Sequence, residues 1–405
     1  MALEFGTFRS SASPHGAEPI RVMVVDDSAV VRGLITRMLE EDSGFSVIAS
    51  VGNGQMALSA LERHAIEVVI LDIEMPVMDG LTALPKLLKI DPELQIIMAS
   101  TLTLRNADIS LQALEAGAAD YIPKPSSSSE ISGLRGGGDF KRELLDKVRA
   151  LAAARRRHPR RVLPSTGPAF SPTPGQPPAT ARPPVTPAAT APARVFLPGR
   201  TPATVTLRPA ANEAPDVIAI GSSTGGPQAL FAVLGALKAG TLRQPILITQ
   251  HMPPTFTTIL AEHIGRISGW ETGEGKDGDL VKPGHIYIAP GDFHMVVETR
   301  GVEKVIRLNK NPPENFCRPS VDPMLRSVSA AWGRRALAVI LTGMGSDGCK
   351  GGQSLVDAGG TVIAQDEPTS VVWGMPGAVA TAGICSAVLP LQEIPQYILR
   401  LASRR

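Results

Sequence analysis

The segment Val217–Pro227 constrains this chain most, because it joins an apolar run to a helical pattern through a glycine- and serine-rich turn. The β-branched residues of the run end at Ile220, which is typical of a buried strand. A strand, turn and helix in this order present reactive groups at the edge of an open α/β sheet. Residues 221–225 fit G-x-S-x-G, a pattern that exposes the hydroxyl of Ser223 on a sharp turn. Ser223 is therefore a candidate nucleophile.

The same turn has two simpler interpretations, a plain loop and a phosphate cradle. A Walker-type phosphate loop ends in Gly-Lys followed by Ser or Thr, whereas this segment continues as Gly226–Gln228. The flanking glycines allow a tight backbone, and amides at the start of the next helix are suited to stabilising an oxyanion. This segment alone does not exclude a plain turn, so the interpretation depends on evidence from the rest of the chain.

Composition excludes several classes of protein. The formal net charge of +2 gives no electrostatic footprint for nucleic acid. The three cysteines, Cys317, Cys349 and Cys385, are scattered, which predicts neither a disulfide framework nor a metal site. Residues 1–19 are polar and unlike a signal peptide, and we expect them to be a disordered tail. Without an apolar stretch long enough to span a bilayer, a cytoplasmic protein without an integral membrane segment is expected.

From Ile20 onward, strand patterns alternate with helix patterns, which predicts a parallel, doubly wound sheet. The expected strands are Ile20–Val25, Phe45–Val51, Val68–Leu71, Gln95–Ala99 and Asp120–Ile122.

Polar residues follow the ends of these strands. Asp26, Asp27 and Asp72 are expected to converge on one crevice, with Ser100 and Lys124 beside them. Three close carboxylates repel one another and suit Mg²⁺, so that one of them can attack a phosphoryl donor. Acidic loop residues without a function would explain the first two aspartates, but not the serine and lysine at the later strand ends.

Residues 20–152 resemble a response-regulator receiver domain. The motifs that carry the resemblance are Val25–Ser28, Leu71–Gly80, Ser100–Thr101 and Lys124–Pro125. The resemblance implies a flavodoxin-like fold, Mg²⁺ held by Asp26, Asp27 and Asp72, and phosphorylation of Asp72 by a CheA-type histidine kinase. It also implies Ser100 as the switch hydroxyl, Lys124 as the phosphate-sensing cation and Tyr121 as the switch aromatic.

A segment rich in Pro, Ala and Thr, residues 153–212, is predicted to be an extended linker. Its basic cluster, residues 155–161, is interpreted as a solvated helix end, with contact to an acidic partner as the alternative. Residues 213–405 form the second predicted domain, in which short alternating runs between residues 280 and 308 suggest a β-rich insertion.

A nucleophilic serine needs a base and an orienting acid. Among the seven histidines, His251 directly follows a strand of the predicted parallel sheet, and His294 is the second candidate. Asp347 follows the expected strand Ala336–Leu341 across a glycine-rich turn, although capping of the next helix is an alternative role. The order Ser, His, Asp differs from that of α/β-hydrolases.

The second domain resembles the chemotaxis protein-glutamate methylesterase (CheB) family. The matching segments are Ile220–Pro227, Thr249–Pro254, Arg318–Asp322 and Leu341–Gly348. The resemblance implies a Rossmann-like fold, Ser223 as nucleophile, His251 as base and Asp347 as orienting acid. Site-lining and oxyanion roles are expected for Thr224, Gly225 and Met344.

The two resemblances together imply a phosphorylation-activated serine hydrolase that demethylates γ-glutamyl esters of methyl-accepting chemoreceptors and deamidates glutamines. No cofactor is expected for the esterase step, and the chain is expected to be a monomer. An unphosphorylated receiver is expected to restrict access to the catalytic crevice. A DNA-binding regulator is disfavoured because no basic domain follows the receiver. A non-catalytic scaffold and an esterase that serves another receptor system remain alternatives.

Overall fold

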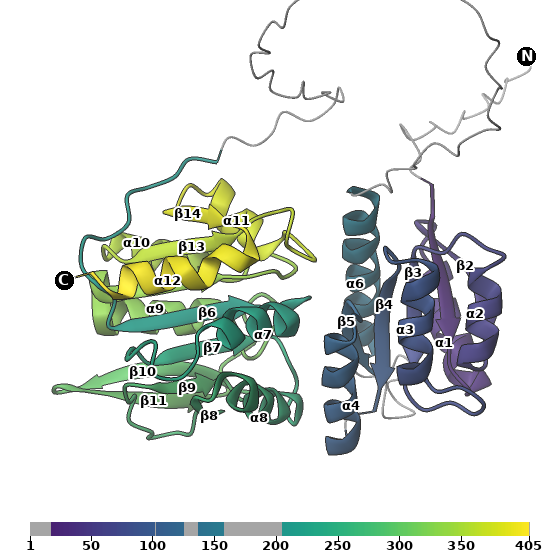
Figure 1. The fold of residues 1–405 in the computed structure, drawn as a ribbon, viewed down its shortest axis with the longest axis horizontal. Helices are drawn as coiled ribbons and strands as arrows, with labels where there is room; N and C mark the ends of the chain where they lie inside the picture. Colours follow the sequence, from purple (N-terminus) through teal and green to yellow (C-terminus); the bar gives the residue numbers. More distant parts are fainter. Residues whose placement is uncertain (1–17, 102, 125–136, 158–204, 405) are drawn as a thin grey trace, which may run out of the picture.

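The computed structural model describes residues 18–101, 103–124, 137–157 and 205–404. Residues 1–17 of the predicted N-terminal tail and residues 158–204 of the predicted linker lie outside these residues. The described chain forms two α/β units, drawn in purple to blue and in teal to yellow in Figure 1. Within the described residues, we find no helix with the length and apolar character needed to cross a membrane.

The first unit is a parallel five-stranded sheet with the strand order β2-β1-β3-β4-β5. Its strands are β1 (Ile20–Val25), β2 (Phe45–Val51), β3 (Val68–Asp72), β4 (Gln95–Ser100) and β5 (Asp120–Pro123). Its helices are α1 (Ala29–Glu40), α2 (Gly54–Leu61), α3 (Gly80–Ile90), α4 (Leu104–Glu115) and α6 (Gly137–Arg157). The strands β1, β3, β4 and β5 are mostly buried, as expected for a sheet that carries helices on both faces, whereas the edge strand β2 is mostly half-buried.

The second unit contains a parallel seven-stranded sheet with the order β14-β13-β12-β6-β7-β9-β8. Its strands are β6 (Val217–Ser222), β7 (Ile246–Gln250), β8 (Glu271–Glu274), β9 (His285–Ile288), β12 (Ala336–Ile340), β13 (Thr361–Gln365) and β14 (Ala387–Leu389). Its helices are α7 (Gly226–Ala236), α8 (Phe256–Ser268), α9 (Val321–Trp332), α10 (Cys349–Asp357), α11 (Met375–Thr381) and α12 (Ile394–Ala402). Both sheets confirm the predicted doubly wound fold.

The predicted β-rich insertion is only partly separate from the main sheet. The strands β10 (His294–Arg300) and β11 (Glu303–Asn309) pair antiparallel with each other, whereas β8 and β9 join the parallel sheet. The expected run at residues 280–284 is not a strand, since Leu280 makes only an isolated bridge with Val305. Pro283 removes an amide donor there and Gly284 takes a φ of 69°, so the run turns instead of continuing.

The predicted limits of the linker differ from the observed elements. Helix α6 continues through Arg157, five residues past the expected end at 152, because Ala and Arg are strong helix formers. The expectation of a solvated helix end is wrong for Arg155, which is only partly exposed and contacts Asp91 at 2.6 Å; Arg156 is exposed, although it contacts Glu67 at 2.6 Å. At the other end of the linker, Ala211 donates to Thr361 Oγ1 at 2.9 Å and so packs on the second unit.

The two units contact each other through α4, β5 and α6 of the first and through α7, α8 and nearby loops of the second (Figure 1). The ring of Tyr121 stacks on Phe256 with centroids 4.5 Å apart. Gln228 donates to the Ala118 carbonyl at 2.6 Å. The buried cluster that contains Leu144 of α6 also contains Val372 of the second unit. These contacts hold the first unit against loops that follow strands of the second sheet.

Candidate active site

Ser223 lies at the point where β6 ends in the centre of the second sheet, between β7 and β12. This is the switch point at which parallel sheets open a crevice. The Ser223 amide donates to the Thr342 carbonyl at 3.0 Å, and Gly225 enters α7 with a φ of 73°. A Cβ atom at Gly343 would lie 2.8 Å from the Ser223 Cβ, so glycine is needed there. The serine is partly exposed, as a nucleophile must be.

His251 follows β7, the neighbour of β6, as predicted. Its amide donates to the Ser222 carbonyl at 3.2 Å, and the Gln250 amide group donates to the Ser223 carbonyl at 3.0 Å. These bonds tie the two strand ends together. The His251 Nε2 lies 2.7 Å from the Asp347 Oδ2, and the imidazole is 11% exposed. The second proposed base, His294, is buried with Nε2 near the Pro312 carbonyl and Nδ1 accepting from Ser320, so both of its nitrogens are engaged.

Asp347 is buried between β12 and α10, and each of its two carboxylate oxygens has three hydrogen-bond partners. The partners of Oδ2 are His251 Nε2, the Ser320 hydroxyl and the Val321 amide, and those of Oδ1 are the Asp322 amide, the Gly348 amide and the Asn315 side chain. Two of these amides belong to the first turn of α9, whereas α10, the helix that Asp347 was expected to cap as its alternative role, has no side-chain cap from its N-cap residue, Gly348. The carboxylate caps α9 and orients His251 at the same time.

The ionisation of this pair follows from its surroundings. Burial raises the pKa of Asp347, but the hydrogen bond and charge of His251 and the α9 amides outweigh it and lower the pKa to about 2. Burial lowers the pKa of His251, whereas the neighbouring Cys317 and Asp347 raise it to about 10. Asp347 is therefore a stable anion that stabilises the protonated form of His251.

Of the predicted lining residues, Thr224 and Gly225 directly follow Ser223, and Met344 follows Gly343, which packs against Ser223. Thr224 is buried, and its carbonyl accepts the Thr342 hydroxyl at 2.9 Å. Met344 is half-buried on the loop after β12 and packs against the buried cluster that contains Leu144 of α6. The oxyanion roles of Thr224, Gly225 and Met344 remain predictions, although their loops border the nucleophile.

The first unit brings together the residues predicted for phosphoryl transfer. The Lys124 Nζ lies 2.6 Å from Asp26 Oδ2 and 2.7 Å from Asp72 Oδ1. Burial and the charge of Asp26 raise the pKa of Asp72 to about 6, against the lowering effect of Lys124. Ser100 accepts the Ser110 hydroxyl at 3.1 Å. These positions agree with the strand-end prediction.

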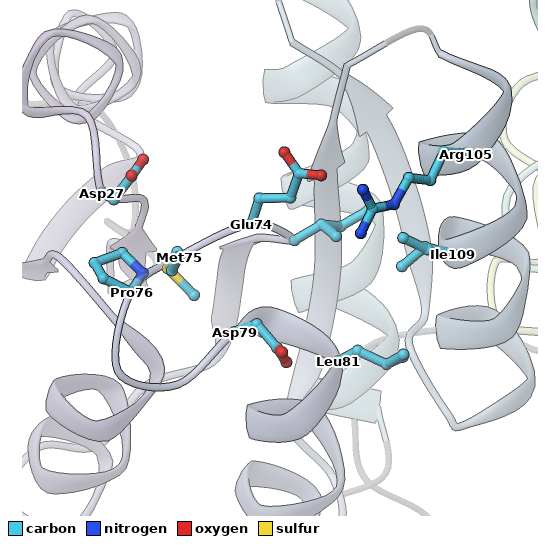
Figure 2. Close-up of a pocket in the computed structure, with 9 residues that line it drawn as sticks. Asp27, Glu74, Met75, Pro76, Asp79, Leu81, Arg105 and Ile109 are labelled. Carbon is cyan, nitrogen blue, oxygen red and sulfur yellow. The ribbon is translucent and has the colours of Figure 1, made fainter.

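The aspartate cluster fits a hard divalent cation. Carboxylate oxygens of Asp26, Asp27 and Asp72 lie within 4.8 Å of one another, and carboxylates of this kind are the donors that Mg²⁺ prefers. A cleft of about 570 Å³ opens beside Asp27 and is lined by the loop after β3 and by α4. Figure 2 shows Glu74 and Arg105 on the walls of this cleft.

Two polar residues close to Asp347 were not singled out from the sequence. Asp322 ends the Arg318–Asp322 segment that resembles the methylesterase family, and its position in the first turn of a helix is the only sequence feature that points to a structural role. Asn315 contacts both carboxylates from a turn, a contact that depends on the tertiary fold.

Comparison with known proteins finds a family match for each of the two units. Residues 218–398 match the family model described as CheB methylesterase, and residues 22–134 match the response regulator receiver domain. A protein from Paramagnetospirillum magneticum, named protein-glutamate methylesterase/protein-glutamine glutaminase 1, is 67% identical over 98% of this chain and 99% of its own length. The chain belongs to the CheB methylesterase family. A relative of the same name from Rhodospirillum rubrum is 62% identical over 96% of both chains.

Two solved structures resemble the two units of this CheB family member separately. The Thermotoga maritima CheB methylesterase catalytic domain is 41% identical and covers 46% of this chain and 99% of its own, with a TM-score of 0.45. The response regulator domain of Thermotoga maritima CheB is 34% identical and covers 32% of this chain and 94% of its own, with a TM-score of 0.29.

Proposed function

We propose that this chain is a protein-glutamate methylesterase and protein-glutamine glutaminase whose receiver regulates it by phosphorylation. The observation that carries the proposal is the placement of Ser223 and His251 at adjoining strand ends, with His251 held 2.7 Å from the buried Asp347. The chemoreceptor is the proposed substrate, since the relatives with the same two family domains are named for this activity.

In the proposed mechanism, His251 accepts the proton of the Ser223 hydroxyl as its oxygen attacks the glutamyl ester carbonyl. The amides of the Ser223 turn and of the Met344 loop stabilise the oxyanion. His251 then gives its proton to the leaving methanol, and a water molecule hydrolyses the acyl-enzyme by the same route. Loss of ammonia in place of methanol deamidates a glutamine.

Asp347 keeps His251 in position and stabilises its positive charge during both steps. Because Asp347 bonds Nε2, we assign the proton exchange with the serine to Nδ1. The hydroxyl of the adjacent Ser222 donates to Gln250 at 2.6 Å and is therefore committed to holding the strand ends.

For regulation, we propose that the described arrangement is the restrained state. Tyr121 stacks on Phe256, the first residue of the helix after the His251 loop. Val372, whose carbonyl accepts the Gly343 amide, is buried in the cluster that contains Leu144 of the receiver. A phosphoryl group on Asp72 would draw Lys124 and Ser100 toward it and change the α4–β5 face, which shifts the population to an open arrangement.

A CheA-type histidine kinase is the proposed phosphodonor, and Asp26, Asp27 and Asp72 are the proposed ligands of Mg²⁺. The ion would neutralise charge on the transferred phosphoryl group. We also propose that the receiver comprises residue 20 through the end of α6 and that the catalytic domain starts before residue 213, where Ala211 already packs on β13.

The experiment is methanol release from methylated receptor membranes by wild type and by Ser223→Ala. We expect release by wild type and its loss in the variant. An organophosphonate probe followed by peptide mass spectrometry should modify Ser223, and Ser222→Ala should still be labelled. Release that persists in Ser223→Ala, or labelling at another residue, would overturn the nucleophile assignment. Absence of release by wild type would favour the scaffold.

A further inference from the structure

A tight hairpin turn covers the acid behind His251. The Glu314 amide donates to the Cys317 carbonyl at 3.2 Å, and the Cys317 amide donates back to the Glu314 carbonyl at 2.9 Å. The two central residues, Asn315 and Phe316, have φ values of 52° and 64°. Two positive φ angles in a two-residue loop are typical of a type I′ turn, where asparagine is well suited to the first position.

This turn is anchored on the helix that Asp347 caps. Both carboxylate oxygens of Glu314 accept from the Arg326 guanidinium of α9, at 2.6 and 3.0 Å. Paired bonds of this kind fix an orientation as well as a distance. The backbone of Asn315 therefore has a defined place above the N-terminus of α9.

From this place the Asn315 side chain bridges two carboxylates. Its Nδ2 lies 2.8 Å from Asp347 Oδ1 and 3.0 Å from Asp322 Oδ2. The amide nitrogen has two hydrogens, so each carboxylate can receive one. An amide cannot ionise, and it therefore bridges the two acids without adding charge.

The two acids cap each other's helices. Asp347 precedes α10 and accepts amides of α9, whereas Asp322 lies in α9 and accepts the Gly348 and Gly351 amides at 3.0 and 2.7 Å. Burial and the charge of Asp347 raise the pKa of Asp322. Two negative groups this close repel each other, and the Asn315 amide is the side chain that bonds to both.

We propose that Asn315 is a positioning residue for the esterase reaction, which holds Asp347 and Asp322 together so that Asp347 stays aligned on His251. This inference rests on the proposed function. Asn315 acts through Asp347 and does not need to touch substrate. Loss of its amide would make Asp347 more basic, so that Asp347 would hold the protonated form of His251 more strongly. The base would then need a higher pH to become neutral.

The other charged or titratable groups that act on this arrangement are Arg326 and Cys349 on Asp322, Arg326 on Asp347, and Cys317 on His251. The Asn315 substitutions leave the chemical identity of these groups in place.

Two variants test the proposal in the full-length protein. Asn315→Gly removes the amide and keeps a residue that tolerates positive φ. Asn315→Asp keeps the shape and places a third carboxylate against the pair. The matched controls are Asn311→Gly and Asn311→Asp, which make the same changes at an exposed position of the same loop. Thermal midpoints identify variants that fail to fold, and either folded variant is sufficient for the test.

We expect Asn315→Gly to lower kcat for methanol release about tenfold, the effect of losing a hydrogen bond to a charged group, with KM unchanged. The acid limb of its pH–rate profile should move to higher pH, and that of Asn315→Asp should move further. The Asn311 variants should match wild type. An unchanged kcat and profile in folded Asn315 variants, a loss confined to KM, or an equal shift in the controls would overturn the proposal.

An NMR titration of the His251 imidazole separates this proposal from the proposed function. Its pKa should rise in both Asn315 variants and stay at the wild-type value in the Asn311 variants. This result does not require that wild type hydrolyse any ester. Inactive wild type with the expected His251 shift would therefore reject the esterase and retain the positioning role, whereas active wild type without the shift would reject the role alone.

Discussion

The contact between Glu115 and His263 gives a direct way to weaken the restrained state without altering either site. Glu115 ends α4 of the receiver, and its Oε1 lies 2.6 Å from the Nε2 of the buried His263. Arg266 donates to the other imidazole nitrogen at 2.7 Å, so the proton of neutral His263 is on Nε2 and is donated to the glutamate. Glu115→Lys would place a cation against an N–H donor and a guanidinium.

The size of the effect follows from exposure. The Glu115 side chain is 44% exposed, which reduces the value of its charge to about 1 kcal/mol. A change of about 1 kcal/mol in the balance between restrained and open states raises the open fraction about fivefold when the restrained state dominates. Unphosphorylated Glu115→Lys should therefore release methanol about five times faster than wild type.

The assay is methanol release with and without a small phosphodonor. The fully activated rate should not change, because Glu115 lies away from both sites, so the stimulation by phosphorylation should fall by the same factor. Asp108→Lys is the matched control, since this α4 residue accepts a hydrogen bond from Gln112 of its own helix. An unstimulated rate equal to wild type in Glu115→Lys, or an equal rise in the control, would refute the reasoning.

Three further predictions concern the catalytic unit. Cys317→Ser should lower the pKa of His251, because the sulfur raises it, and the acid limb of the pH–rate profile should move to lower pH; an unchanged limb would contradict this. Because folding raises the pKa of His251, protonated His251 stabilises the fold fully below the unfolded pKa of about 6.5, and this stabilisation is lost as the pH rises toward about 10. The difference in thermal midpoint between wild type and His251→Gln should therefore shrink from pH 6 to pH 9. Gly343→Ala should lower kcat at least about tenfold, because its Cβ would lie 2.8 Å from the Ser223 Cβ; a wild-type kcat would show that the crowding is relieved.

The positions of the main site residues could be predicted because they depend on local patterns. Ser223, His251 and Asp347 each follow a strand, and adjacent parallel strands bring such residues together at one edge of a sheet. The same reasoning placed Lys124 beside Asp26 and Asp72 in the receiver. Apolar runs and strand-end polar residues are sufficient for this level of prediction.

The contacts that were missed depend on tertiary structure. Asn315 reaches Asp347 only because α9 and α10 begin side by side, which no local pattern encodes. Where helix α6 continues past its predicted end, Arg155 and Arg156 contact acidic partners on the receiver. Composition near a proline-rich segment could not reveal those partners.

The most direct test of receiver control over a serine esterase compares wild type with Asp72→Asn. Methanol release from methylated receptor membranes would be measured with Mg²⁺, before and after addition of a small phosphodonor. We expect the donor to stimulate wild type and to leave Asp72→Asn at its unstimulated rate. Equal stimulation of both proteins, or an active wild type that does not respond to the donor, would contradict the account.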